Sequence, residues 1–199
     1  MITSAWAGVY FFSIALVLAL LEIQIEGPHG WAARLPTWRW DSPRVRRWLG
    51  KPVTGYHVFL NLFILLLLHL PLVVVGASIE RESEILSLYF LLCVSWDFLW
   101  FVCNPHFGLR RFKPGHVWWF QGWWLGIPVA YFSGIAISAA IWILAAAPGT
   151  HRAKAATWLM LFLEIAGLVA ATLTLNAVRR RVPRAGRGIA VEEESAAGR

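Results

Sequence analysis

The chain has 199 residues, of which 58% are hydrophobic and 15% are charged, against about 25% charged in an average soluble domain. The charged residues stand in short blocks between long apolar runs, an arrangement typical of a protein that crosses a membrane several times. The net charge of +7 is therefore attributed to membrane topology. It argues against a soluble domain, and no nucleic-acid-binding motif accompanies it.

Five apolar runs are long enough to cross the hydrocarbon core as helices, which takes about 20 residues each. The sequence thus predicts an all-α, polytopic membrane helix bundle over residues 1–181, without internal repeats. A disordered cytoplasmic tail is expected to follow over residues 182–199. The five predicted transmembrane helices are residues 3–26, 53–77, 84–104, 127–147 and 156–178.

The basic residues indicate how these helices are oriented. Of the 18 Lys and Arg residues, all but Arg81, Arg152 and Lys154 fall in the first loop, the third loop or the tail. Because cytoplasmic loops are enriched in Lys and Arg, this asymmetry predicts an outside N-terminus and a cytoplasmic C-terminus. A multi-pass protein of a bacterial inner (plasma) membrane is expected.

The two long cytoplasmic loops are rich in tryptophan. Together they hold eight of the 13 Trp residues, interleaved with Arg, Lys, Pro and Gly. Indole rings favour the headgroup layer, so these loops are expected to lie along the inner interface as short helices and turns. They could serve only as anchors, or they could form a lid over a site.

Polar side chains gather at the cytoplasmic ends of the first three predicted helices. Glu22 and Glu26 lie four residues apart and therefore share one helix face. His57 begins the second helix, and Asp97 lies within the third, where burying a charge costs at least a few kcal/mol. The same level of the bilayer is predicted to hold a wider set: Glu22, Glu26, His29, His57, Asn61, Asp97, Asn104, His106 and His116.

Carboxylates combined with imidazoles suit a divalent transition metal, and the share of carboxylate favours iron, with manganese or zinc as alternatives. Asn61 and Asn104 are expected to orient the imidazoles, and Asp97 and Glu22 are the candidate catalytic residues. Three basic residues, Arg110, Arg111 and Lys113, are candidates for holding a phosphate headgroup. The candidate metal ligands are Glu22, Glu26, His29, His57, Asp97, His106 and His116.

Two further polar residues stand apart from this set. His69 precedes Pro71 and is expected to bond backbone groups near the kink that the proline causes. Glu164 lies alone in the fifth helix, where it is either protonated or paired across the bundle. Small residues at four-residue spacing, Ala130, Gly134 and Ser138, are expected to let the fourth and fifth helices pack closely as a scaffold.

The function predicted from this pattern is a metal-dependent membrane enzyme acting on a lipid, isoprenoid or quinone-like substrate. An oxidoreductase is favoured slightly over a hydrolase, because no Ser or Cys nucleophile stands beside a base. One alternative is an electron-transfer module with a b-type haem between His57 and His106. Others are a non-catalytic membrane subunit that docks a partner, or a purely structural set of polar residues. An oligomer or a partner subunit is left open.

Overall fold

The computed structural model describes residues 6–181, which are mostly helical with two short pairs of strands. The predicted tail, residues 182–199, lies outside the described residues. The helices are α1 (Ala7–Glu26), α2 (Pro43–Leu49), α3 (Gly55–Leu68), α4 (Leu70–Val75), α5 (Ile79–Cys103), η1 (Leu109–Arg111), α6 (Val129–Leu144) and α7 (His151–Arg181). The antiparallel strand pairs are β1 (Arg39–Trp40) with β2 (Val53–Thr54), and β3 (Trp123–Trp124) with β4 (Ile127–Pro128).

Four helical segments are long and apolar enough to cross a membrane: Ala7–Glu26, Gly55–Val75, Ile79–Cys103 and His151–Arg179. The second of these combines α3 and α4, which are separated only at His69. The predicted fourth span corresponds to α6, an apolar helix of 16 residues. At 1.5 Å per residue, α6 is about 24 Å long, shorter than a hydrocarbon core of about 30 Å. Five crossings therefore remain a prediction.

Side-chain caps set where the helices begin. Ser42 caps α2 with Pro43 at its first position, Thr54 caps α3, and Ser78 caps α5. An N-cap side chain accepts a hydrogen bond from a backbone N–H that the helix itself cannot satisfy. The cap at Ser78 starts α5 five residues before the predicted span. Glu84, the first residue of the predicted span, is therefore buried inside the helix.

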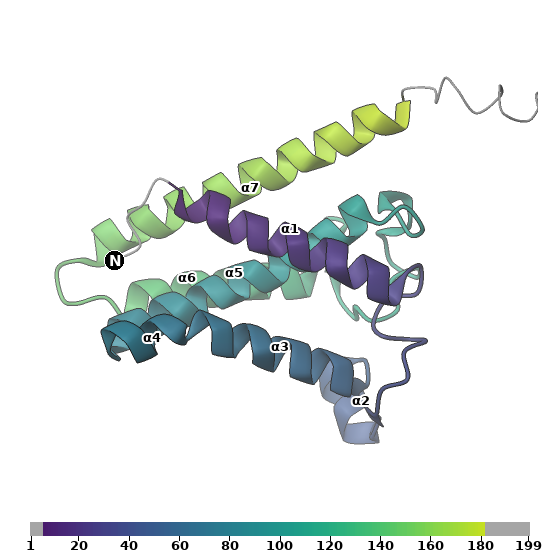
Figure 1. The fold of residues 1–199 in the computed structure, drawn as a ribbon, viewed down its shortest axis with the longest axis horizontal. Coiled ribbons are helices and arrows are strands. Elements are labelled where there is room, and N and C mark those ends of the chain that lie inside the picture. The colour runs from purple at the N-terminus through teal and green to yellow at the C-terminus, as the bar shows by residue number, and fades with distance from the viewer. Residues whose placement is uncertain (1–5, 182–199) are drawn as a thin grey trace, which may run out of the picture.

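The centre of the fold is α5. More than half of its apolar stretch is buried, 56%, against 6% for the Gly55–Val75 segment. In Figure 1, α1, α6 and α7 lie along α5, while α3 and α4 lie at the edge of the bundle. The outer surfaces of α1, α3 and α7 are apolar and exposed, as expected for helices that face lipid.

The small residues of α6 pack against α5 as well as against α7. A Cβ atom at Gly134 would come within 2.8 Å of Val94 Cγ2, and Ser138 exchanges a 2.8 Å hydrogen bond with Ser87. α6 also packs against α7 as expected, and Trp158 Nε1 of α7 donates a 2.9 Å hydrogen bond to Ser138 Oγ, but α5 is a further neighbour that was not expected. Close approach of two backbones needs small side chains on one of them, and at Gly134 the neighbour is α5.

A buried ion pair joins α5 to α7 at the end of the bundle opposite the long loops. Lys154 Nζ lies 2.5 Å from Glu84 Oε1 and 2.6 Å from Glu80 Oε1. Nearby, the His69 ring bonds the backbone as expected, with Nδ1 2.6 Å from the Leu65 carbonyl oxygen. At the first turn of α1, Glu164 packs against Gly8, where any Cβ atom would collide with the carboxylate.

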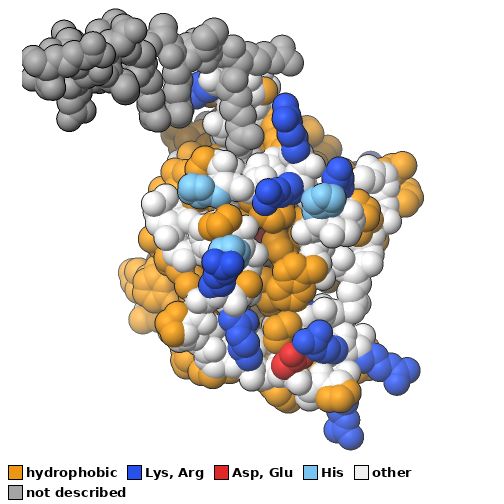
Figure 2. All heavy atoms as spheres, turned by 90° about the vertical axis from the view of Figure 1, so that its right-hand side faces the viewer, with side chains coloured by type: hydrophobic (Ala, Val, Ile, Leu, Met, Phe, Trp, Pro, Cys, Tyr) orange, Lys and Arg blue, Asp and Glu red, His pale blue; other side chains and the backbone are white. Residues whose placement is uncertain are grey.

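The other end of the bundle carries the two long loops. Figure 2 looks onto this end and shows Lys, Arg and His side chains spread across it between apolar patches. Arg34, Arg44, Arg47, Arg110 and Arg111 are all exposed there. The concentration of basic residues in two segments distant in sequence is thus also a concentration in space.

Candidate metal centre

A cavity of about 190 Å³ opens between α1, α3 and α5 at the end that carries the long loops. It is lined by Glu22, Glu26, Trp31, His57, Asn61, Cys93, Trp96, Asp97, Trp100 and Trp119. Five of the polar residues singled out in the sequence thus border one space: Glu22, Glu26, His57, Asn61 and Asp97.

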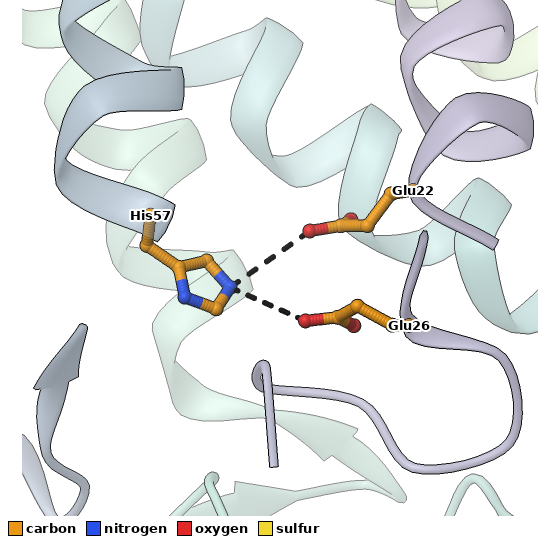
Figure 3. A group of neighbouring side chains, drawn as sticks. All are labelled: Glu22, Glu26 and His57. Carbon is orange, nitrogen blue, oxygen red and sulfur yellow. Dashed lines mark ion pairs between the residues drawn. The ribbon is translucent and has the colours of Figure 1, made fainter. Parts of the chain in front are cut away.

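Two carboxylates converge on one imidazole nitrogen in this cavity, as Figure 3 shows. His57 Nε2 lies 3.8 Å from Glu22 Oε1 and 3.7 Å from Glu26 Oε1. One ligand atom from each of the three residues falls within 4.8 Å of the others. Two ligands of one ion are at most about 4.2 Å apart when each bond is about 2.1 Å. Three ligands of one tetrahedral ion are about 3.4 Å apart, so the two His57 contacts need to close by about 0.3–0.4 Å, and the two carboxylate oxygens by at most about 1.4 Å, to share an ion.

Both carboxylates are buried, each with 8% of its surface exposed. Among residues 6–181, neither has a Lys or Arg nitrogen within 4.0 Å, and His57 is the ion-pair partner of both. A buried charge is costly unless it is paired or bound to a metal. Two carboxylates facing one imidazole thus leave negative charge that a divalent cation would neutralise.

The end of α1 holds Glu26 in place. Gly27 ends the helix with φ of 60°, and the chain then turns back so that the Ala32 N–H donates to Glu26 Oε1. Trp31 and Ala32 have φ of 48° and 49°, a left-handed conformation that costs non-glycine residues energy and clusters at functional sites. The loop after α1 thus folds back over the acidic end of the helix.

Thr54 orients the imidazole. Its Oγ1 lies 2.6 Å from His57 Nδ1 and also accepts the hydrogen bond from the His57 backbone N–H that caps α3. Thr54 is fully buried. When Nδ1–H donates to this hydroxyl oxygen, Nε2 presents its lone pair to the cavity. A hydrogen bond at one ring nitrogen is how proteins aim the other at a metal.

A stack of side chains covers the imidazole. The Trp31 ring is stacked on the His57 ring, with 4.1 Å between the ring centres. Lys51 Nζ lies 3.3 Å from the centre of the Trp31 ring and makes a cation-π contact with it. Trp31 Nε1 donates to the Pro52 carbonyl. Burial lowers the pKa of the Lys51 ammonium to about 8, and the Asp97 carboxylate opposes that shift. The tryptophan-rich loop thus closes over this cavity, in addition to any anchoring that it provides.

Asp97 borders the cavity beside the three-residue group. Its Oδ2 accepts a hydrogen bond from the Tyr131 hydroxyl of α6. Within residues 6–181, the buried indole N–H of Trp100 in the cavity wall has no hydrogen-bond acceptor, whereas that of Trp96 lies beside the Glu22 carboxylate. Buried donors in native proteins are normally satisfied, so an oxygen-bearing ligand in the cavity would have a donor available.

The other predicted ligands lie elsewhere. His106 and His116 are exposed and His29 is half-buried, and none of the three borders the cavity. Each of the three lies in a loop that follows a helix, and the path of the loop keeps its side chain out of the cavity. Arg110 and Arg111 lie on η1 and, with Lys113, are exposed outside the cavity.

Asn61 and Asn104 do not orient an imidazole, and that expectation was wrong. Asn61 donates to the His57 backbone carbonyl and accepts from the Tyr89 hydroxyl. Asn104 donates to the Gly27 carbonyl, which ties the end of α5 to the end of α1. Both asparagines therefore hold the helices that carry the site, and Thr54 holds the ring.

Four residues of the site were missed in the sequence: Trp31, Lys51, Thr54 and Tyr131. Thr54 could have been found, because a threonine three residues before His57 at the start of an apolar run is an N-cap pattern. Lys51 was counted only as a topology signal and Trp31 only as a loop aromatic. Nothing in the sequence brings Tyr131 next to Asp97.

The comparisons with known proteins add no family to this description. No protein-family model, no curated protein and no solved structure matches the chain.

The geometry allows specific chemistry. Glu22, Glu26 and His57 offer three ligands from two helices, which would leave further coordination positions open toward Asp97 and the Trp100 indole. An open position is what a catalytic metal site needs and a structural one lacks. A bound divalent ion there would act as a Lewis acid or a redox centre.

Proposed function

We propose that this chain is a multi-pass membrane protein that binds a divalent transition metal through Glu22, Glu26 and His57 near the cytoplasmic face. The observation that carries the proposal is the convergence on His57 Nε2 of two buried carboxylates that have no Lys or Arg partner in the described part of the chain. The hydrogen bond between Thr54 and Nδ1 supports it, because it leaves Nε2 free to bind.

The ligand set favours iron or manganese. Two carboxylates and a single imidazole make an oxygen-rich site, whereas soft thiolate ligands would favour zinc or copper. The haem alternative needs a second axial imidazole. His106, its proposed partner, is exposed and does not border the cavity, so no observation favours a haem.

We further propose that the metal serves an enzyme that acts on a lipophilic substrate, with an oxidoreductase favoured over a hydrolase. The support is the cavity beside the three ligands, which is also lined by Asp97 and by the Trp100 indole, a donor without an acceptor among the described residues. In this proposal Asp97, bonded to Tyr131, exchanges protons with the substrate. The Trp31–Lys51 stack excludes water from the imidazole side.

Elemental analysis of the detergent-purified protein tests metal binding. Wild type is expected to retain about one iron or manganese per chain, and His57→Ala and Glu26→Gln are expected to lose it. His106→Ala is the matched control, since it removes an exposed histidine and should retain the metal. Equal metal content in all four proteins, or none in any, would reject the site.

The enzyme proposal has a separate test. Membrane lipids from cells that express wild type and His57→Ala are compared by mass spectrometry. A lipid species that changes with wild type but not with the variant supports catalysis. Identical lipid profiles, with metal present in wild type, would leave a metal-binding protein and reject the enzyme.

A further inference from the structure

A second cavity, of about 560 Å³, lies between α5, α6 and α7. Its walls include Val94, Phe98, Ile135, Phe162, Val169 and Leu173. Its volume falls in the range of small-molecule sites, about 300–1,000 Å³. It is larger and far less polar than the cavity that holds Glu22 and His57.

The two cavities lie on opposite faces of α5. Successive helical residues are rotated by about 100°. Cys93, Trp96, Asp97 and Trp100 line the first cavity, and Leu91, Val94, Ser95 and Phe98 line the second. The second cavity is therefore a separate site, which does not depend on the proposed metal.

Hydrocarbon suits this cavity better than water. Its polar wall groups are few, and the hydroxyl of Tyr131 is already bonded to Asp97. A water molecule needs two to four polar partners, which the aliphatic and aromatic walls do not supply. The apolar segments of α5 and α7 place the cavity at the depth of lipid chains.

Two arginines adjoin the lining of this cavity at η1, which we take as its mouth. Leu109 and Phe112 line it and flank Arg110 and Arg111 in η1. Both arginines are exposed, and within the described part of the chain neither has a carboxylate within 4.0 Å. Arg111 instead lies over the Phe107 ring, 5.8 Å from its centre. Guanidinium groups without an acidic partner are suited to phosphate.

We propose that this cavity binds one hydrocarbon chain of an anionic phospholipid, with the lipid phosphate held by Arg110 and Arg111. The volume and the apolar walls select the chain, and the two arginines at the mouth select the charge of the headgroup. Binding is saturable, which distinguishes it from the exchange of bulk lipid over the outer faces of α3 and α7.

Native mass spectrometry of the full chain with an equal mixture of phosphatidylglycerol and phosphatidylcholine tests the proposal. Wild type is expected to retain phosphatidylglycerol at least about fivefold over phosphatidylcholine, at about one lipid per chain, as expected for charge-assisted phosphate binding. Ala170→Trp fills the cavity and should reduce retention of phosphatidylglycerol at least about fivefold. Ala171→Trp, one residue away and outside the cavity wall, should retain it as wild type does.

A second pair of variants tests the headgroup and does not disturb helix packing. Arg110→Ala combined with Arg111→Ala should abolish the preference, so that the ratio of retained phosphatidylglycerol to phosphatidylcholine falls to about one, because the phosphate contacts are lost. Arg44→Ala combined with Arg47→Ala removes two exposed arginines of α2 and should leave the preference intact. No preference in wild type, or an unchanged preference in the Arg110 and Arg111 double variant, overturns the proposal.

Discussion

Thr54 is the residue on which the orientation of the imidazole depends. Its side-chain oxygen contacts both His57 Nδ1 and the His57 backbone N–H. Thr54→Val keeps the shape but removes this oxygen. We expect metal affinity to fall about 10–100-fold, together with a loss of about 1 kcal/mol of helix stability from the missing cap. Competition with a chelator measures the affinity, and Thr54→Ser should restore it. Unchanged affinity in Thr54→Val would show that the hydroxyl does not orient the ring.

The titration of Lys51 is expected to make the stability of the folded protein depend on pH. The pKa of Lys51 is lowered to about 8 by burial, whereas an unfolded lysine has a pKa of about 10.4. Below pH 8 both states bind the proton, so the cost of burying the charge is fully present. Between about pH 8 and 10.4 the unfolded state binds more protons, so stability rises with pH.

The variant Lys51→Met removes this titration. The difference in unfolding midpoint between wild type and Lys51→Met should therefore shift in favour of wild type as pH rises from 8 toward about 10.4. Lys51→Met also loses the cation-π contact with Trp31, which contributes only while Lys51 is protonated and therefore fades above about pH 8. A difference that stays constant across this range would contradict the burial of Lys51.

The ionisable residues of the site could be predicted from the sequence more readily than the residues that contact them. Glu22, Glu26, His57 and Asp97 are ionisable residues within apolar runs, and the cost of placing them there marks them in the sequence. His29, His106 and His116 looked equivalent but lie in loops, whose paths no periodicity fixes. The contact of Tyr131 with Asp97 depends on which face of α6 meets α5, and that is decided by packing around Gly134.

At the scale of the elements, α5 and α7 are joined by a buried ion pair. Lys154→Met leaves Glu84 buried without a partner, and breaking such a pair costs about 3–5 kcal/mol. The unfolding midpoint in detergent should fall accordingly. Arg152→Met, an exposed neighbour with no ion pair among the described residues, should change it little. The double variant Lys154→Met with Glu84→Leu should recover much of the loss, and failure to recover would mean that the pair is not the source of the stability.

The positions of the helices could be predicted because a lipid environment requires long apolar runs. The residues at which the helices begin and end were harder to predict. The predicted third span began at Glu84, since the charges of residues 80–84 resemble a solvated turn. Lys154 compensates Glu84 and Glu80 from a distant helix, so α5 extends to Ile79. An ion pair between residues about 70 positions apart cannot be recognised from the local sequence.

At the scale of the whole molecule, the number of crossings decides where the C-terminus lies. If α6 crosses despite its 16 residues, the protein has five spans and the excess of basic residues in the tail faces the cytoplasm. Alkaline phosphatase fused after Gly149 should then be active, since it folds only outside the cytoplasm, and a fusion at the C-terminus should be inactive. With an inactive fusion in the loop between α1 and α3, which places that loop in the cytoplasm, the reverse pair of results would show that α6 does not cross and that the chain has four spans.

The central claim is that Glu22, Glu26 and His57 bind one metal ion. X-ray absorption spectroscopy of the metal in the purified protein tests it most directly, because it reports the ligand atoms. We predict oxygen and nitrogen ligands at about 2.0–2.2 Å, with a single imidazole, and a changed spectrum or lost metal in Glu26→Gln. A shell of sulfur at about 2.3 Å, two or more imidazoles, or identical spectra for wild type and Glu26→Gln would contradict the claim.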